Sequence, residues 1–130
     1  MILDTSFIID LMEMDEGALD KHGQLVEKNE TSRISSAALF ELWSGVGHSK
    51  KGEEEKLKIM RALSGISTIA LTAPMAEKAG EIHGTLAKEG RGIDNIDAMI
   101  ASTALHENET LLTRNVKHFA RVNGLRIESY

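Results

Sequence analysis

The sequence contains no cysteine, which excludes disulfide bonds and metal sites built on thiolates. This absence also agrees with a reducing compartment, and we expect a cytoplasmic protein. No apolar run approaches the roughly 20 residues that a membrane-spanning helix needs, and the segment after Met1 lacks the basic and apolar regions of a secretory signal. We therefore expect a soluble protein that does not associate with membranes.

Proline is nearly absent, with Pro74 the only one, and the chain shows no internal repeats or low-complexity segments. Its 130 residues, 42% of them hydrophobic and 27% charged, are typical of one globular domain that buries roughly two thirds of its unfolded surface. We expect residues 1–130 to form this single domain. The formal net charge of −5 disfavours general affinity for nucleic acid, so a nucleic-acid partner would need a local basic patch or bridging metal ions.

Short apolar runs alternate with longer helical patterns, and this alternation predicts parallel strands joined by helical crossovers. The fold class is therefore α/β. A run of β-branched residues at 66–71 indicates a buried strand. In all, we expect a sheet of about five strands, at residues 2–4, 33–35, 66–71, 110–113 and 125–127.

Helical patterns fill the intervals between these strands. The first expected helix lies around residues 7–11, with Thr5 or Ser6 as its N-cap. The second expected helix has Ser36 as its N-cap, and its helical pattern ends at residues 45–47, where two glycines occur.

Three further helices are expected in the second half of the chain. One opens at Gly52, the next has Pro74 just inside its first turn, where the missing N–H costs nothing, and the last opens near Asp94. Periodic spacing predicts the residues that face the core. They are Leu57, Met60 and Leu63 in the first of these helices; a stripe of mostly small residues, Ala76, Ala79, Gly80, His83, Leu86 and Ala87, in the next; and Ile96, Met99, Ile100, Thr103 and Ala104 in the last.

Four polar residues stand at the end of a strand or in the first turns of a helix: Asp4, Glu41, Asp97 and Asn115. In an open parallel sheet, ligands bind beyond the carboxyl ends of the strands, where Asp4 and Asn115 lie. Glu41 and Asp97 reach the same edge if their helices flank the central strands. Acids gathered there would repel one another unless a cation neutralised them, and Mg²⁺ or Mn²⁺ is the hard cation that prefers oxygen ligands.

Each of these residues also has a plain structural interpretation, and the sequence leaves both open. Asp4 could end a strand and cap a helix, Glu41 could face solvent, and Asn115 could cap the turn that follows it. Asp94 and Asp97, three residues apart, could serve only as the start of a helix, where acids are favoured.

Histidines and basic residues give weaker signals. The five histidines show no spacing typical of a zinc site, and His83 fits a core or interface position on its apolar stripe. Arg114, Lys117 and Arg121 are dispersed enough to be ordinary surface residues. Because Arg114 and Lys117 lie beside the expected site, they could also contact phosphates.

The polar residues lie in four segments: ILDTS at 2–6, SAALFEL at 36–42, DAMIASTA at 97–104 and LLTRNVKHF at 111–119. No single segment is specific, since each is a polar residue beside an apolar helix or strand. In order and spacing they cover nearly the whole chain. Together they resemble the PIN domain, and within it the VapC-type ribonuclease toxins of type II toxin–antitoxin systems.

This resemblance implies a Rossmann-like three-layer α/β/α sandwich whose central sheet is mostly parallel. It also implies an endoribonuclease, dependent on Mg²⁺ or Mn²⁺, that hydrolyses RNA phosphodiesters with a metal-activated water and is held by a small antitoxin protein. It assigns catalysis and metal binding to Asp4, Glu41 and Asp97, with Ser6, Thr113 and Asn115 as supporting polar residues.

The chain departs from the family pattern at Asn115, where many relatives carry a further acid. An amide oxygen can ligate or orient a water but brings no negative charge, so it supports a second metal less well; Asp94, one turn before Asp97, could supply that charge. A PIN-like binding module or RNA-processing factor with an inactive site is the alternative function. A phosphoacceptor receiver domain is a weaker rival, because the strand at 66–71 offers no acceptor aspartate.

The apolar helix stripes also predict a homodimer. The stripes that begin at Leu57 and Ala76 offer more apolar surface than a sheet of about five short strands can cover. Exposed patches of that kind usually mark interfaces.

Overall fold

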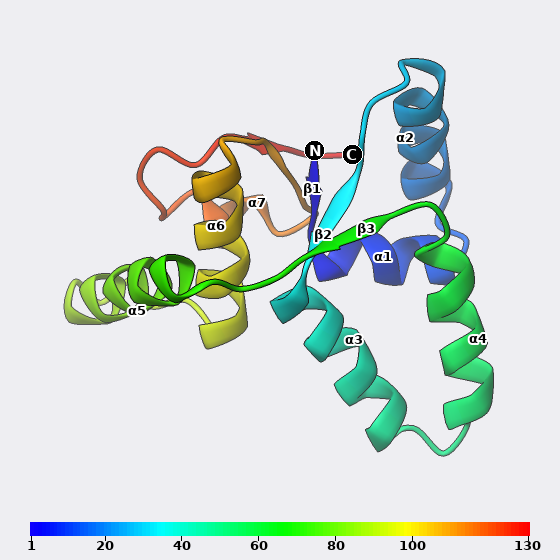
Figure 1. Ribbon diagram of the computed structural model, residues 1–130, viewed down its shortest axis with the longest axis horizontal. Coiled ribbons are helices and arrows are strands. Elements are labelled where there is room, and N and C mark those ends of the chain that lie inside the picture. The colour runs from blue at the N-terminus through cyan, green and yellow to red at the C-terminus, as the bar shows by residue number, and fades with distance from the viewer.

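A wholly parallel five-stranded sheet forms the centre of the protein, whose computed structural model describes residues 1–130 (Figure 1). The strands are β1 Ile2–Leu3, β2 Arg33–Ser35, β3 Ser67–Ile69, β4 Leu111–Leu112 and β5 Ile127–Glu128. Their order in the sheet is β3-β2-β1-β4-β5, and every neighbouring pair is parallel. The α/β prediction is confirmed, with a sheet that is entirely rather than mostly parallel.

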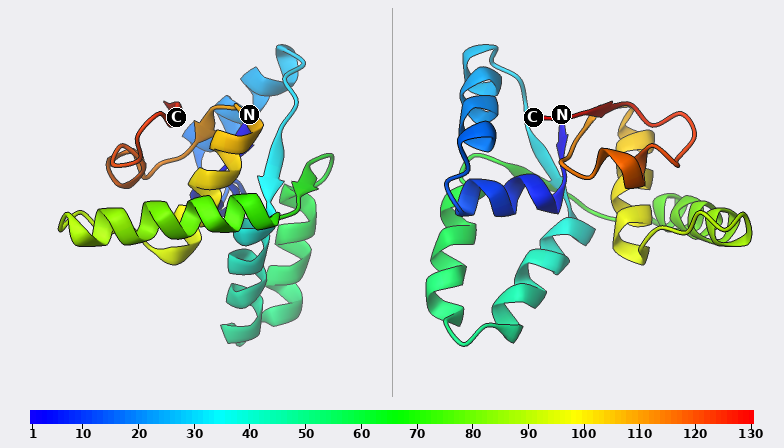
Figure 2. Two further views of the ribbon diagram at one scale, coloured as in Figure 1. Left: turned by 60° about the vertical axis from the view of Figure 1, so that its left-hand side comes forward. Right: turned by 180° about the vertical axis from the view of Figure 1, so that it is seen from behind.

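Seven helices surround the sheet: α1 Thr5–Met12, α2 Glu16–Glu27, α3 Ser36–His48, α4 Gly52–Ala62, α5 Ala73–Lys88, α6 Asn95–Glu107 and α7 Val116–Phe119. Helices α1, α2 and α4 lie on one side, and α5 and α6 lie on the other (Figures 1 and 2). This completes the three-layer arrangement, and α3 extends beyond the carboxyl ends of the strands. The sequence did not predict α2, and α3 continues through residues 45–47, where it was expected to fade. None of the seven helices combines the length and apolar character that a bilayer crossing requires.

The first and third helices are capped one residue earlier than predicted. Asp4 occupies the N-cap position of α1, so the predicted caps Thr5 and Ser6 are wrong. Ser35, not Ser36, caps α3, and its hydroxyl accepts a backbone N–H bond at 3.1 Å. In both places the backbone of the N-cap residue is still extended, so one residue ends the strand segment and starts the helix.

Two predicted inward faces differ from those in the structure. In α4 the buried residue is Ile59, whereas Leu63 is half-buried and Leu57 and Met60 are 54% and 56% exposed. β3 is an edge strand in which only Ile69 is buried, so the predicted buried strand is mostly exposed. An edge position gives a strand fewer covering neighbours, and β-branched residues fit exposed strands as well as buried ones.

The inward face of α5 matches the predicted stripe only in part. Its buried residues are Met75, Ala79 and Leu86. The small residues expected to face inward, Ala76, Gly80 and Ala87, are exposed, and His83 is half-buried. The predicted stripe is therefore confirmed at Ala79 and Leu86 and wrong at Ala76, Gly80 and Ala87, and Met75 is buried in addition.

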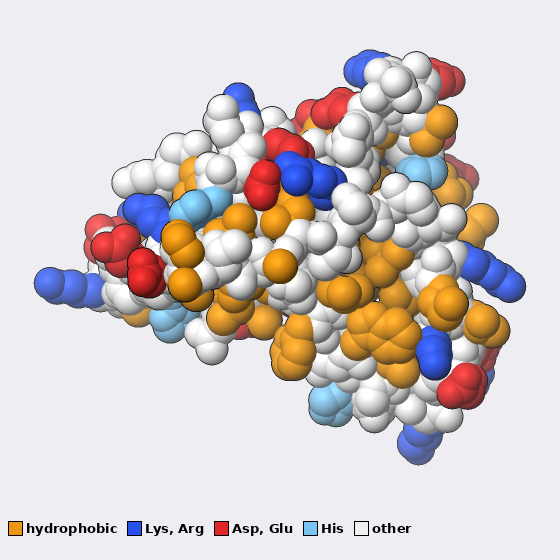
Figure 3. Space-filling view, in the orientation of Figure 1, with side chains coloured by type: hydrophobic (Ala, Val, Ile, Leu, Met, Phe, Trp, Pro, Cys, Tyr) orange, Lys and Arg blue, Asp and Glu red, His pale blue; other side chains and the backbone are white.

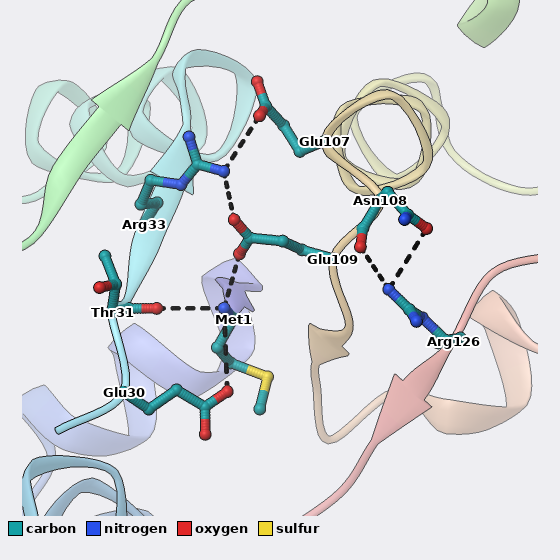
Figure 4. A network of polar contacts seen from close by, with 8 residues as sticks. All are labelled: Met1, Glu30, Thr31, Arg33, Glu107, Asn108, Glu109 and Arg126. Carbon is teal, nitrogen blue, oxygen red and sulfur yellow. Dashed lines mark hydrogen bonds and ion pairs between the residues drawn. The ribbon is translucent and has the colours of Figure 1, made fainter. Parts of the chain in front are cut away.

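A network of ion pairs joins the amino ends of β1 and β2 to the segment before β4 (Figure 4). The Met1 ammonium group donates to Glu109 Oε2 at 2.6 Å and to the Thr31 carbonyl at 3.1 Å. Arg33 pairs with the same Glu109 and with Glu107, the latter at 3.0 Å. Burial alone would raise the pKa of Glu109, but hydrogen bonds from the ammonium and guanidinium groups lower it overall. These contacts fix the edge of the sheet opposite the carboxyl ends of the strands.

Candidate active site

Asp4 lies directly after β1 and is the most deeply buried acid at the carboxyl edge of the sheet, with 2% of its surface exposed. Its Oδ2 accepts hydrogen bonds from Ser6 Oγ and Thr113 Oγ1, each at 2.7 Å. A buried carboxylate requires such donors, because an unpaired one is strongly disfavoured. Although Asp4 holds the N-cap position of α1, its side chain makes no capping bond. Its oxygens therefore serve the site rather than the helix end.

The two hydroxyl groups that support Asp4 also hold the loop after β4. Ser6 Oγ accepts the Arg114 backbone N–H at 3.2 Å, and Thr113 Oγ1 accepts that of Asn115 at 2.9 Å. Each hydroxyl thus donates to the carboxylate and accepts from the backbone at once. This double use fixes the orientation of both hydroxyls and of Asp4 between β1 and β4.

Asp97 lies in the first turn of α6, and its side chain is 19% exposed. Burial, followed by the negative charges of Asp4 and Asp94, raises the pKa of Asp97 to about 6. His118 acts in the opposite direction, since its Nδ1 lies 4.0 Å from Asp97 Oδ2. Asp94 caps α6 by accepting the Ile96 N–H at 3.4 Å. The start of α6 therefore combines a capping acid with a second acid whose pKa is raised by the charge of Asp4.

Glu41 brings a third element, α3, to the same place. Glu41 is an exposed residue, yet partial burial of its carboxylate raises its pKa. The negative charges of Asp97, Asp4 and Asp94 raise this pKa further. Four acids from the end of β1, from α3 and from the start of α6 therefore influence one another. Like charges gathered in this way are stabilised by a cation.

The donor set fits a hard divalent cation that keeps part of its water shell. No three histidine, aspartate or glutamate side chains already stand in a closed arrangement around a common point. Such a cation needs only a few direct carboxylate ligands, and the others act through water. Thr5, the residue after Asp4, carries a buried hydroxyl oxygen without a hydrogen-bond partner, which a bound water would satisfy. The cluster lacks thiolates and paired histidines, so zinc fits it poorly.

The remaining predicted residues lie in the loop and helix after β4. Asn115 is exposed and stands at the N-cap position of α7, but its side chain makes no capping bond. Lys117 is exposed, whereas the exposed Arg114 side chain pairs with Asp10, Nη1 to Oδ1, at 2.5 Å. Asp10 and His118 have no role predicted from the sequence. An acid four residues after Ser6 within an apolar helix was the available signal for Asp10.

The sequence matches one known family along almost its whole length. The family model of the PIN domain matches residues 1–125. Ribonuclease VapC2 of Rickettsia felis is 36% identical over 129 residues, which cover 99% of this chain and 96% of the relative. The tRNA(fMet)-specific endonuclease VapC of Shigella flexneri is 35% identical over 97 residues, or 75% of this chain and 74% of that protein.

Solved structures share the fold as well as the sequence pattern. The VapBC2 complex of Rickettsia felis bound to a DNA fragment from its promoter matches with a TM-score of 0.88 at 35% identity, covering 98% of this chain and 96% of that one. VapBC-1 from nontypeable Haemophilus influenzae gives a TM-score of 0.83 at 29% identity over the same shares of the two chains. The parallel sheet and the acids at its carboxyl edge thus occur in a chain that belongs to the PIN-domain family, among the VapC ribonucleases.

Proposed function

We propose that the chain is a divalent-metal-dependent endoribonuclease that acts in the cytoplasm as the toxin of a type II toxin–antitoxin pair. The observation that carries this proposal is the convergence of Asp4, Glu41 and Asp97, three carboxylates from separate elements, at the carboxyl edge of the sheet. The substrate class comes from relatives, which are named as a ribonuclease in Rickettsia felis and a tRNA-specific endonuclease in Shigella flexneri. RNA is therefore the proposed substrate.

Asp4, Glu41 and Asp97 would hold Mg²⁺ or Mn²⁺, directly or through water. When bound, the cation would acidify a coordinated water and offset the charge that develops on the phosphoryl oxygens. Ser6 and Thr113 keep the Asp4 carboxylate in one orientation by donating to its Oδ2. Because Asp4 is buried and Glu41 is exposed, the cluster is closed toward the sheet and open toward solvent, from which an RNA strand can approach.

The direct test is cleavage of RNA by the purified protein with Mg²⁺ or Mn²⁺, then with excess EDTA, and finally after the cation is restored. We expect cleavage only while a divalent cation is present. RNA that is bound but left intact with either cation would contradict the proposal and would favour a PIN-like binding module with an inactive site.

Asn115→Asp is expected to strengthen Mn²⁺ binding by roughly tenfold, because a carboxylate replaces a neutral amide at the rim of the site. The Asn115 side chain is exposed and makes no capping bond, so the substitution breaks no contact of the fold. Calorimetric titration of both proteins with Mn²⁺ measures the difference. Unchanged or weaker affinity would show that position 115 does not contribute to the cation site, and would leave Asp94 as the source of extra charge.

An exposed apolar patch on α3 and α4 supports a protein partner. It consists of Phe40, Trp43, Leu57 and Met60, which are 65%, 37%, 54% and 56% exposed. Figure 3 shows hydrophobic side chains gathered over these two helices. Large exposed apolar patches on soluble proteins mark interaction sites. We propose that the patch is covered in a homodimer, although the residues that the sequence analysis placed on α5 do not contribute to it.

Light scattering is expected to give about twice the 14.2 kDa mass of one chain, and Leu57→Lys is expected to reduce it to one chain. A wild-type mass of one chain at micromolar concentration would rule out the dimer.

The VapBC complexes among the related structures support a small antitoxin as the second partner. A basic antitoxin side chain entering the acidic cluster would compete with the metal ion. If the protein encoded beside this gene neither co-purifies with it nor suppresses cleavage, the toxin role is wrong and the nuclease role stands.

A further inference from the structure

A second polar cluster, centred on Asp10 of α1, adjoins the carboxylates. Asp10 is 7% exposed, and both of its oxygens have partners. Its Oδ1 accepts from Arg114 Nη1 at 2.5 Å, and its Oδ2 accepts from the Tyr130 hydroxyl at 2.6 Å. With both oxygens engaged, Asp10 is held as a partner of Arg114 rather than offered as a further metal ligand.

Arg114 contacts α1 at two points on the same face. Its backbone N–H donates to Ser6 Oγ at 3.2 Å, and its guanidinium group reaches Asp10, four residues further along the helix. Ser6 in turn donates to Asp4 at 2.7 Å. The guanidinium group is therefore displaced along α1 by about 6 Å, the rise of four helical residues, from the hydroxyl that supports Asp4. It lies beside the carboxylates and not among them.

Tyr130 holds the other side of Asp10. Its ring packs edge-to-face against Phe7, with the ring centroids 4.9 Å apart. Burial, and next the hydrogen bond to Asp10, raise the pKa of the Tyr130 phenol, so the phenol remains a protonated donor at physiological pH. Asp10 is thus fixed from two directions, which leaves its Oδ1 aimed at Arg114.

The anchored Arg114 side chain remains 58% exposed. A guanidinium group carries five N–H donors, and Asp10 accepts from only one of its nitrogens. The remaining donors are open to solvent at the rim of an acidic site that would otherwise repel RNA phosphates. Anchoring also keeps the positive charge from folding over Asp4, where it would compete with a cation.

We propose that Arg114 binds the RNA phosphate that flanks the scissile one, and that Asp10 and Tyr130 are positioning residues that hold its guanidinium group in place. The proposal rests on the ribonuclease function proposed above. Phosphate contacts of this kind fix the register of a nucleic acid without reading its sequence. A side chain that is already ordered loses less conformational entropy when the phosphate binds.

The test is binding of a short, mixed-sequence, fluorescein-labelled single-stranded RNA, measured by anisotropy in an Asp97→Asn background that prevents cleavage. Adding Arg114→Gln is expected to weaken binding roughly tenfold and to reduce the slope of log Kd against log salt concentration by about 0.7, the value for one phosphate contact on a single strand. Arg126→Gln is the matched control. Arg126 bonds Asn108 at the opposite edge of the sheet, so this variant should bind RNA as the background protein does (Figure 4).

Asp10→Asn and Tyr130→Phe test the anchor separately. Each is expected to weaken RNA binding roughly threefold when Arg114 is present and to have no effect in the Arg114→Gln background, because each acts through the guanidinium group. Arg114→Lys should keep the salt slope, since the charge remains, but bind less tightly, since an ammonium group lacks the planar fork.

The outcomes separate the inference from the function on which it rests. If Arg114→Gln changes neither affinity nor salt slope while the wild-type protein cleaves RNA, the phosphate role is wrong and the ribonuclease stands. If Asp10→Asn and Tyr130→Phe weaken binding equally with and without Arg114, the positioning role is wrong, and thermal unfolding of the same variants shows whether folded protein was lost. If the wild-type protein neither binds nor cleaves RNA, the proposed function fails and the inference fails with it.

Discussion

Asp4→Asn, Glu41→Gln and Asp97→Asn are each expected to lower metal-dependent RNA cleavage by roughly a thousandfold or more, because each removes a charge from the group that would hold the cation. The three side chains influence one another from β1, α3 and α6, so the loss of any one weakens the whole cluster. Initial rates of RNA cleavage at saturating Mn²⁺ measure the effect. Calorimetry on the same variants separates lost metal affinity from lost rate.

Matched substitutions away from the site control for the change in charge. Asp20→Asn on α2 and Glu54→Gln on α4 alter exposed acids and should leave cleavage unchanged. Far-ultraviolet circular dichroism should show every variant folded, since none of the three acids is needed for a capping bond. If Asp97→Asn were unfolded yet kept its activity per folded molecule, Asp97 would serve the start of α6 and not the reaction.

The sequence placed these acids at the same edge of the sheet as the structure does, because each acid is tied to a local pattern. Asp4 follows an apolar strand, and Asp97 follows a helix cap, so a parallel sheet has to bring them to one edge. The prediction of five parallel strands succeeded for the same reason, since short apolar runs separated by helices leave few arrangements. Local pattern and fold point to the same geometry in these segments.

Other features depend on contacts between distant residues and left no local signal. Helix α2 buries Ala18, Lys21 and Leu25, and Lys21 is paired with Glu128 from the far end of the chain. A buried lysine breaks the apolar period on which helix prediction relies. The bond between Asp10 and Tyr130 likewise joins residues 120 positions apart, so only the folded chain reveals it.

The acids that would serve the reaction also destabilise the folded protein when no cation is bound. Burial and the charges of Asp4 and Asp94 raise the pKa of Asp97 from 3.8 to about 6, which means that ionised Asp97 is less favourable in the folded chain than in the unfolded one. Above pH 6 the folded state carries this unfavourable charge in full. Below pH 4 Asp97 is protonated in both states and has no such effect.

In EDTA at pH 7, Asp97→Asn is therefore expected to increase the free energy of unfolding by on the order of 2 kcal/mol and to raise the melting temperature by roughly 5 °C. Between the two pKa values the folded state binds more protons than the unfolded state, so the contribution of Asp97 to stability falls as the pH rises from about 4 to about 6. The advantage of the variant should grow over that window. Urea unfolding of both proteins at pH 4, 5, 6 and 7 measures this difference in stability, and comparing the two proteins cancels titrations that they share, such as that of Glu109.

Millimolar Mn²⁺ should reverse the ranking of the two stabilities, because only the wild-type protein gains the free energy of cation binding. A variant that is less stable than the wild type at pH 7 in EDTA would show that Asp97 supports the fold, and that the acids do not repel one another as their arrangement implies.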